Sequence, residues 1–130
     1  MQNPEPTERE LQILKVLWDR GEATVREVYE ALREQLPIVQ NTVQAFLRIM
    51  EDKQLVSHTT RGRSFVYRAE LDRDPTSKRL VSSVLDGVFD GALDALVASA
   101  LSVKKPNNKE LERLRELLAE HEKGSKGPKR

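Results

Sequence analysis

Hydrophobic residues recur at helical spacing through the first part of the chain, and capping residues divide them into separate segments. A Thr-x-x-Glu pattern favours a helix start because each side chain bonds to the other residue's backbone N–H. The pattern occurs twice, as Thr7 with Glu10 and as Thr24 with Glu27. We expect the first helix to end at Gly21 and the second to close at Leu36-Pro37.

The segment NTVQAFLRIMEDKQL, residues 41–55, predicts a third helix with two unlike faces. One face carries an apolar stripe at i, i+3, i+4 and i+7, which we expect in the core. Its members are Val43, Phe46, Leu47 and Met50. The other face has small and hydrogen-bonding side chains with one cation. We expect Asn41 or Gln40 to cap the helix.

After residue 55 the apolar period shortens to about two, which is typical of strands. Residues 55–60 and 64–68 are rich in β-branched and aromatic side chains. Arg61-Gly62-Arg63 between them supplies the glycine that a tight hairpin favours. A short strand at Glu22-Ala23 would complete a small sheet. The element order predicts a mostly α protein with a small β-hairpin, and residues 1–73 form its winged helix-turn-helix domain.

Asp72-Arg73-Asp74-Pro75 is expected to be a break, and residues 74–122 read as three short amphipathic helices. Asn107 with Glu110 predicts the cap of the last helix. Helices this short bury too little apolar surface to be stable alone, so we expect a helical dimerisation domain. Residues 123–130, a basic segment with two glycines, are expected to be a disordered tail. The expected dimer contacts are Val81, Val84, Leu85, Val88, Phe89, Leu93, Leu96, Val97, Leu111, Leu114 and Leu118.

Composition limits what else the chain could do. With 130 residues, 38% hydrophobic and 33% charged, the chain can bury one modest core and a small second one. No run approaches the roughly 18 to 20 apolar residues of a membrane span, and MQNPEPTERE lacks the features of a signal peptide, so we expect a cytoplasmic protein without membrane contact. The absence of cysteine excludes disulfides, thiolate metal sites and cysteine nucleophiles.

Catalytic chemistry has no support in the sequence. There is no Ser/His/Asp set, paired-carboxylate pocket, phosphate loop or HExxH pattern, so we expect neither an enzyme nor a cofactor. His58 and His121 are interpreted as surface residues rather than metal ligands.

The polar face of the third helix is the best candidate for function. In a helix-turn-helix, the second helix of the pair enters the major groove, so polar side chains near its N-terminus can reach bases or phosphates. The net charge of +1 gives no general argument for nucleic acid, but arginines cluster near the hairpin. A solvated face, or a surface that docks on a protein partner, is the alternative. The candidate DNA contacts are Thr24, Asn41, Thr42, Gln44, Ala45, Arg48, Arg61 and Arg63.

Several blocks occur in a familiar order. They are PTERELQILKVLWDRGEATVREVYEAL, NTVQAFLRIMEDKQLVSH, GRSFVYRAE, VLDGVFDGALDALV and ELERLRELLAE. From about Pro6 to Glu120 the chain resembles the penicillinase-repressor family of the BlaI/MecI type, which includes the copper-responsive CopY type. The resemblance implies a homodimeric transcriptional repressor on an inverted-repeat operator. It places DNA contacts in the third helix, at Asn41, Thr42 and Gln44, and in the wing, at Arg61 and Arg63.

The chain also departs from the family pattern. Ile49 stands where an arginine is usual, and Gln54 stands where glycine usually follows the third helix. Members that respond to β-lactams are cleaved by a sensor protease at an Asn-Phe bond, and the aligned residues here are Ser99-Ala100. Cleavage therefore occurs elsewhere, uses another specificity, or does not operate, which leaves a protease partner open. Copper-responsive members bind metal through C-terminal cysteines, which this chain lacks.

Overall fold

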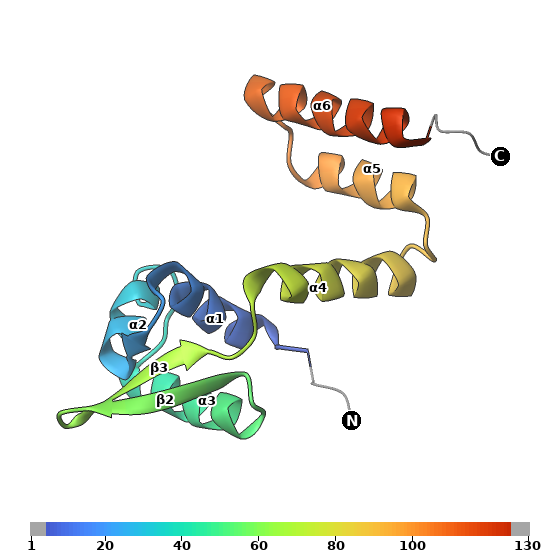
Figure 1. The fold of residues 1–130 in the computed structure, drawn as a ribbon. Helices are drawn as coiled ribbons and strands as arrows, with labels where there is room; N and C mark the ends of the chain where they lie inside the picture. The colour runs from blue at the N-terminus through green and yellow to red at the C-terminus, as the bar shows by residue number, and fades with distance from the viewer. Residues whose placement is uncertain (1–4, 126–130) are drawn as a thin grey trace. The chain divides into compact units, whose positions relative to one another are not determined.

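A computed structural model describes residues 5–125, which divide after Ser82 into two compact units. The helices and strands follow the order helix, strand, helix, helix, hairpin, and then further helices (Figure 1). This order confirms the predicted mostly α fold with a small hairpin. Its elements are α1 (Glu8–Arg20), β1 (Ala23–Thr24), α2 (Val25–Leu32), α3 (Gln40–Asp52), β2 (Val56–Arg61), β3 (Ser64–Ala69), α4 (Arg73–Gly87), α5 (Leu93–Val103) and α6 (Asn108–Ser125).

Both predicted capping boxes are present. The Thr7 hydroxyl accepts the Glu10 N–H at 3.2 Å, and the Glu10 carboxylate accepts the Thr7 N–H at 2.9 Å. At the start of α2, the Thr24 hydroxyl accepts the Glu27 N–H at 3.1 Å, and the Glu27 carboxylate accepts the Thr24 N–H at 2.9 Å. Gly21 ends α1 with a φ of 87°, a conformation that glycine adopts without steric cost. The predicted end of α2 is wrong, because the helix stops at Leu32 and a turn covers the residues before Pro37.

The expected cap of α3 is also wrong. Val39 takes the N-cap position in an extended conformation and makes no side-chain capping bond, while both Gln40 and Asn41 lie inside the helix. The apolar stripe behaves as predicted, with Val43, Leu47 and Met50 fully buried and Phe46 partly buried against the core. These residues pack against buried side chains of α1, α2 and the sheet, namely Ile13, Leu14, Leu17, Val28, Leu32, Leu55, Val56 and Tyr67.

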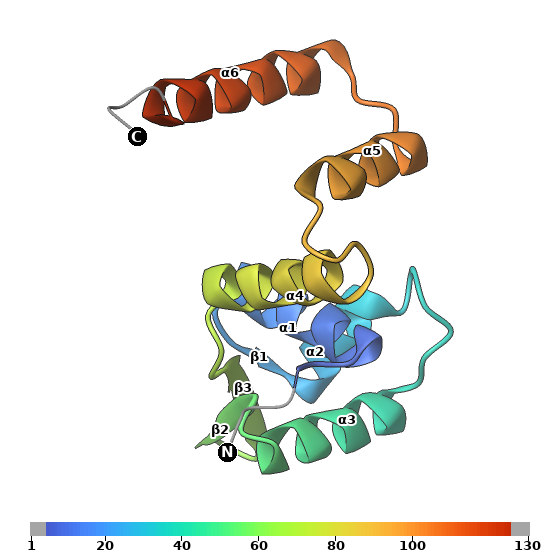
Figure 2. The same cartoon turned by 90° about the vertical axis from the view of Figure 1, so that its right-hand side faces the viewer.

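The sheet has the strand order β1-β3-β2, and both pairings are antiparallel. In the hairpin, His58 lies opposite Tyr67 and Thr60 opposite Phe65. Gly62 has a φ of 64° at the turn, as the hairpin prediction requires. The short strand expected at Glu22-Ala23 exists one residue further along, where Ala23 and Thr24 pair with β3. The hairpin packs beside α3, which Figures 1 and 2 show from two directions.

The first turns of α4 belong to the N-terminal unit. The expected break at Asp72–Pro75 is wrong, because α4 begins at Arg73 and Pro75 lies in its first turn, where a missing N–H costs nothing. The Trp18 indole N–H donates to the Leu71 carbonyl at 2.8 Å, and Thr76 is buried. The division at Ser82 therefore lies beyond the boundary at residue 73 that the sequence suggested.

Apolar residues of the later helices stay accessible. Asn107 and Glu110 form the expected cap at the start of α6, with bonds of 3.0 and 2.7 Å. That helix runs to Ser125 and so includes the first residues of the segment expected to be a tail, whereas residues 126–130 lie outside the described residues. Of the expected dimer contacts, Leu85, Phe89, Leu96 and Leu111 are half-buried, and Val81, Val84, Val88, Leu93, Val97, Leu114 and Leu118 are exposed.

Candidate nucleic-acid interface

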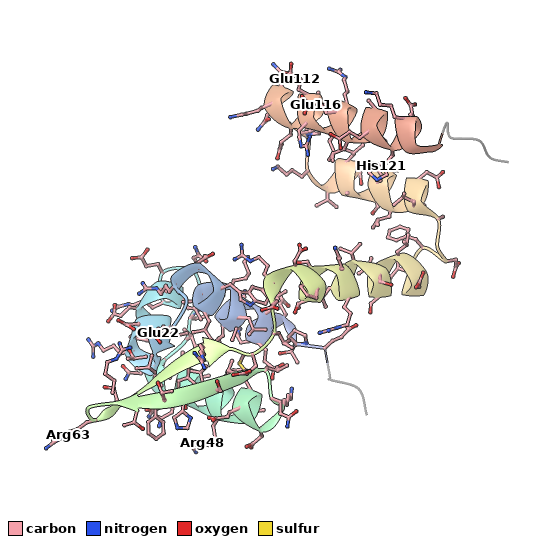
Figure 3. All side chains as sticks on the ribbon, in the orientation of Figure 1. Glu22, Arg48, Arg63, Glu112, Glu116 and His121 are labelled. Carbon is pink, nitrogen blue, oxygen red and sulfur yellow. The ribbon has the colours of Figure 1, made fainter. Side chains whose placement is uncertain are left out.

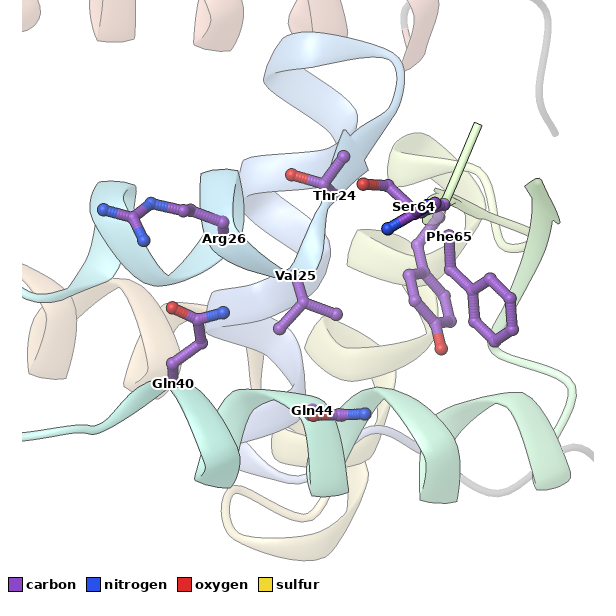
Figure 4. A pocket seen from close by; sticks show the side chains of 9 residues that line it. Thr24, Val25, Arg26, Gln40, Gln44, Ser64 and Phe65 are labelled. Atoms are coloured by element: carbon purple, nitrogen blue, oxygen red, sulfur yellow. The ribbon is translucent and has the colours of Figure 1, made fainter. Parts of the chain in front are cut away.

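A shallow groove of about 360 Å³ lies between α3 and the hairpin. It brings together three of the candidate DNA contacts, which are Thr24, Gln44 and Arg63. Figure 4 shows Thr24 and Gln44 in the groove. Thr24 comes from the N-terminus of α2, Gln44 from the second turn of α3 and Arg63 from the hairpin turn. The remaining lining residues were not among the DNA contacts predicted from the sequence: Val25, Arg26, Gln40, Ser64, Phe65 and Tyr67.

The N-terminal half of α3 presents an accessible polar surface. The five candidates on this helix, Asn41, Thr42, Gln44, Ala45 and Arg48, are all exposed. Among residues 5–125, the side chains of Asn41 and Gln44 have no hydrogen-bond partner, so both amides keep free donors and acceptors. Such amides match the paired donor and acceptor that adenine presents in the major groove.

The two wing arginines differ in their surroundings. Arg61 donates to the Glu22 carboxylate at 2.6 Å, so its guanidinium is already paired. Arg63 extends from the tip of the hairpin, away from the rest of the unit (Figure 3), and has no ion pair within the described part of the chain. Arg63 is therefore available to a phosphate, whereas Arg61 must first leave Glu22.

The interpretation of His58 as a plain surface residue is wrong. Its Nδ1 lies 2.8 and 2.9 Å from the two carboxylate oxygens of Glu51 on α3. The imidazole also stacks on Phe65, with centroids 4.1 Å apart and an interplanar angle of 19°. His58 therefore links α3 to the hairpin, the two elements on either side of the groove.

Tyr67 packs against His58, with ring centroids 5.3 Å apart, and keeps a neutral hydroxyl. Burial raises the pKa of Tyr67, and the Glu51 carboxylate raises it further, whereas the charge of Arg48 lowers it. The hydroxyl thus stays protonated at neutral pH and remains a hydrogen-bond donor in the groove.

An ion pair fixes the far end of α3. Lys53 donates to the Glu10 carboxylate at 2.8 Å, and the Glu10 side chain is only 2% exposed. Burial by itself raises the pKa of Glu10, but the hydrogen bonds from Lys53 and from the Thr7 backbone, with the charge of Lys53, leave that pKa below its usual value. Gln54 follows with a φ of 67°, so it takes the left-handed conformation that a glycine would adopt more easily.

Metal and membrane sites have no counterpart among the described residues. Within residues 5–125, no three His, Asp or Glu side chains gather closely enough to hold a metal ion. No helix in that range has the length and hydropathy needed to cross a bilayer. His121 is exposed, and its Nδ1 lies 2.9 Å from the Leu117 carbonyl oxygen.

A helical core, an exposed polar third helix and a hairpin tipped by a free arginine together define a winged-helix DNA-binding protein. The sequence profile of the family described as Penicillinase repressor matches residues 6–120, and the chain belongs to that family. It is a DNA-binding transcriptional repressor, and the family is not a class of enzymes. The resemblance stated from the sequence is confirmed.

Known proteins agree with this assignment. The penicillinase repressor of Bacillus licheniformis is 26% identical over 123 residues, which cover 95% of this chain and 96% of that protein. The solution structure of the DNA-binding domain of the repressor BlaI is 28% identical, with a TM-score of 0.51, and covers 55% of this chain and 88% of that one. YusO of Bacillus subtilis, 17% identical with a TM-score of 0.54 over 91% of this chain and 75% of that one, shares the fold alone.

Proposed function

We propose that the chain represses transcription as a homodimer that occupies an inverted-repeat operator in the cytoplasm. The groove that joins Thr24, Gln44 and Arg63 carries the proposal, because these side chains come from the three parts of a winged helix that meet DNA. α3 enters the major groove, where Asn41 and Gln44 read base edges. The N-terminus of α2 and the wing hold phosphates.

The accessible apolar residues of α4, α5 and α6 support the dimer. Helix α5 contains no buried residue, although its mean hydropathy is high for a surface helix. Leu93 is 61% exposed, Val97 46% and Leu118 67%. A surface with so much exposed apolar area favours association, and a second copy of the same chain supplies a matching surface.

Sedimentation of the purified protein tests the dimer. We expect a species of about twice 14.9 kDa at micromolar concentration. Val97→Asp should shift it toward monomer by placing a charge on the apolar stripe of α5, whereas Ala95→Asp, on the opposite side of the same helix, should not. A folded monomer of 14.9 kDa for the native chain at that concentration would refute the proposal.

A truncation tests whether dimerisation contributes to DNA affinity. The shortened chain should end at Ser82 rather than at the sequence-predicted boundary, because Thr76 is buried in the N-terminal unit. We expect residues 1–82 to fold but to lose most operator affinity, since the two half-sites are no longer bound by one linked molecule. Undiminished affinity of the truncated chain would show that the second unit has another purpose.

A sensor protease is not part of this proposal. The bond aligned with the cleavage site of β-lactam-responsive relatives is Ser99–Ala100, which lies inside α5. Its residues differ from the usual Asn-Phe pair, and the helix would have to unwind locally before that bond could be cut.

A further inference from the structure

An aromatic ring is left accessible in the groove, beside its polar side chains. Phe65 of β3 is 48% exposed, although its neighbours Val66 and Tyr67 are buried. It lines the groove together with Gln44 (Figure 4) and Arg63. A half-exposed phenyl ring gains stability when a partner removes it from water, so the groove offers an apolar contact as well as polar ones.

Residues of the hairpin and of α3 together hold the Phe65 ring in position. His58 of β2 stacks on it at 4.1 Å, and Tyr67 meets it edge-on with centroids 6.4 Å apart. Glu51 of α3 bonds to the same imidazole at 2.8 and 2.9 Å. The contacts from Glu51 to His58 and from His58 to Phe65 therefore fix the position of Phe65 relative to α3.

We propose that Phe65 contacts C–H groups of bound DNA, and that His58 and Glu51 act as positioning residues for this contact. The inference rests on the proposed operator binding and adds to it an uncharged contact with the DNA. Thymine methyl groups and deoxyribose rings are the apolar groups that duplex DNA presents in its grooves. Continuity with Gln44 and Arg63 places the ring within the same DNA-facing surface.

Substitution of Phe65 tests the contact. We expect Phe65→Ala to weaken operator binding about tenfold per half-site, because roughly half of a phenyl ring remains to be buried. The dependence of affinity on salt should not change, since no phosphate contact is lost. Phe65→Leu should keep most of the affinity. Thr59→Ala is the matched control, because Thr59 is exposed on the opposite face of the hairpin and lies opposite Val66.

A double-mutant cycle tests the positioning role of His58. His58→Ala should weaken binding in the native chain but have no further effect when Phe65 is already alanine. Glu51→Gln, which keeps a hydrogen bond to the imidazole, should retain more affinity than Glu51→Ala. Thermal unfolding of every variant separates lost contacts from lost folding. Equal effects of His58→Ala in both backgrounds would overturn the positioning role.

The DNA probe identifies the group that Phe65 touches. Operators in which uracil replaces single thymines lose only the methyl group. If uracil at one position lowers the affinity of the native chain but not of Phe65→Ala, the contact is with that thymine methyl. If uracil at every position leaves the affinity of the native chain unchanged, the contact is with deoxyribose. Native affinity in a folded Phe65→Ala variant overturns this inference alone. A native chain without preference for any operator would instead overturn the proposed function.

Discussion

Arg61 is paired with Glu22 in the free protein. We therefore predict that the Glu22 carboxylate competes with DNA phosphates for the Arg61 guanidinium. The two groups are 2.6 Å apart, and their side chains are 68% and 47% exposed. A pair this accessible contributes roughly 0.2 to 1 kcal/mol, because water screens it. Glu22→Gln removes the competing carboxylate, so we expect DNA affinity to rise about 1.4- to fivefold per half-site.

The same reasoning predicts which of the two wing arginines, Arg61 or Arg63, contributes more to DNA affinity. Arg63→Ala should lower the slope of log affinity against log salt by about 0.9 per half-site, because one phosphate contact is lost. Arg61→Ala should cost less affinity than Arg63→Ala, since Arg61 must leave Glu22 before it binds DNA. In the Glu22→Gln background the two alanine substitutions should cost about the same.

Fluorescence anisotropy of a labelled duplex, measured over a series of salt concentrations, is a suitable assay. Glu34→Gln provides the control. It removes the same charge from another exposed glutamate, but Arg61 pairs with Glu22 and not with Glu34. Weaker binding by Glu22→Gln, or an equal gain in Glu34→Gln, would refute the reasoning. A larger loss for Arg61→Ala than for Arg63→Ala would refute it as well.

Further predictions concern base reading and stability. Gln44→Ala should cost roughly 1 to 3 kcal/mol on the operator and less on random duplex, and equal losses on both in a binding assay would exclude base reading. The pKa of Glu10 is lowered in the folded state, so its stabilising effect is present above the unfolded pKa and lost as pH falls through the folded one. Denaturant titrations at several acidic pH values should therefore show that the free energy of unfolding falls less steeply with falling pH in Glu10→Gln than in the native chain. The same pH dependence in both would contradict this. Gln54→Gly should raise the free energy of unfolding by up to about 1 kcal/mol, whereas a loss of stability would show that Gln54 is unstrained.

Local signals made most of the fold predictable. The capping boxes of α1 and α2 and the glycine at the hairpin turn act within a few residues, so the sequence alone indicates them. The end of α2 and the cap of α3 could not be predicted in the same way. No strong stop signal follows Leu32, and Val39 caps α3 through its extended backbone rather than through a polar side chain.

Contacts between distant residues explain what the sequence did not reveal about the site. Glu22 meets Arg61 across 39 positions, and Lys53 meets Glu10 across 43. Phe65 follows strand periodicity like any hairpin residue, and its exposure beside α3 depends on the packing of the whole unit. The helical face of α3 could be predicted because its period is local, but the presence of Phe65 and Tyr67 in the groove beside it could not.

Recovery of genomic DNA fragments by the purified full-length protein, in competition with random duplex at near-physiological salt, tests the central claim most directly. We expect enrichment of one inverted repeat, with half-sites separated by about one helical turn or a multiple of it. A folded dimer that enriches no sequence would contradict the assignment of α3 as a reader of bases.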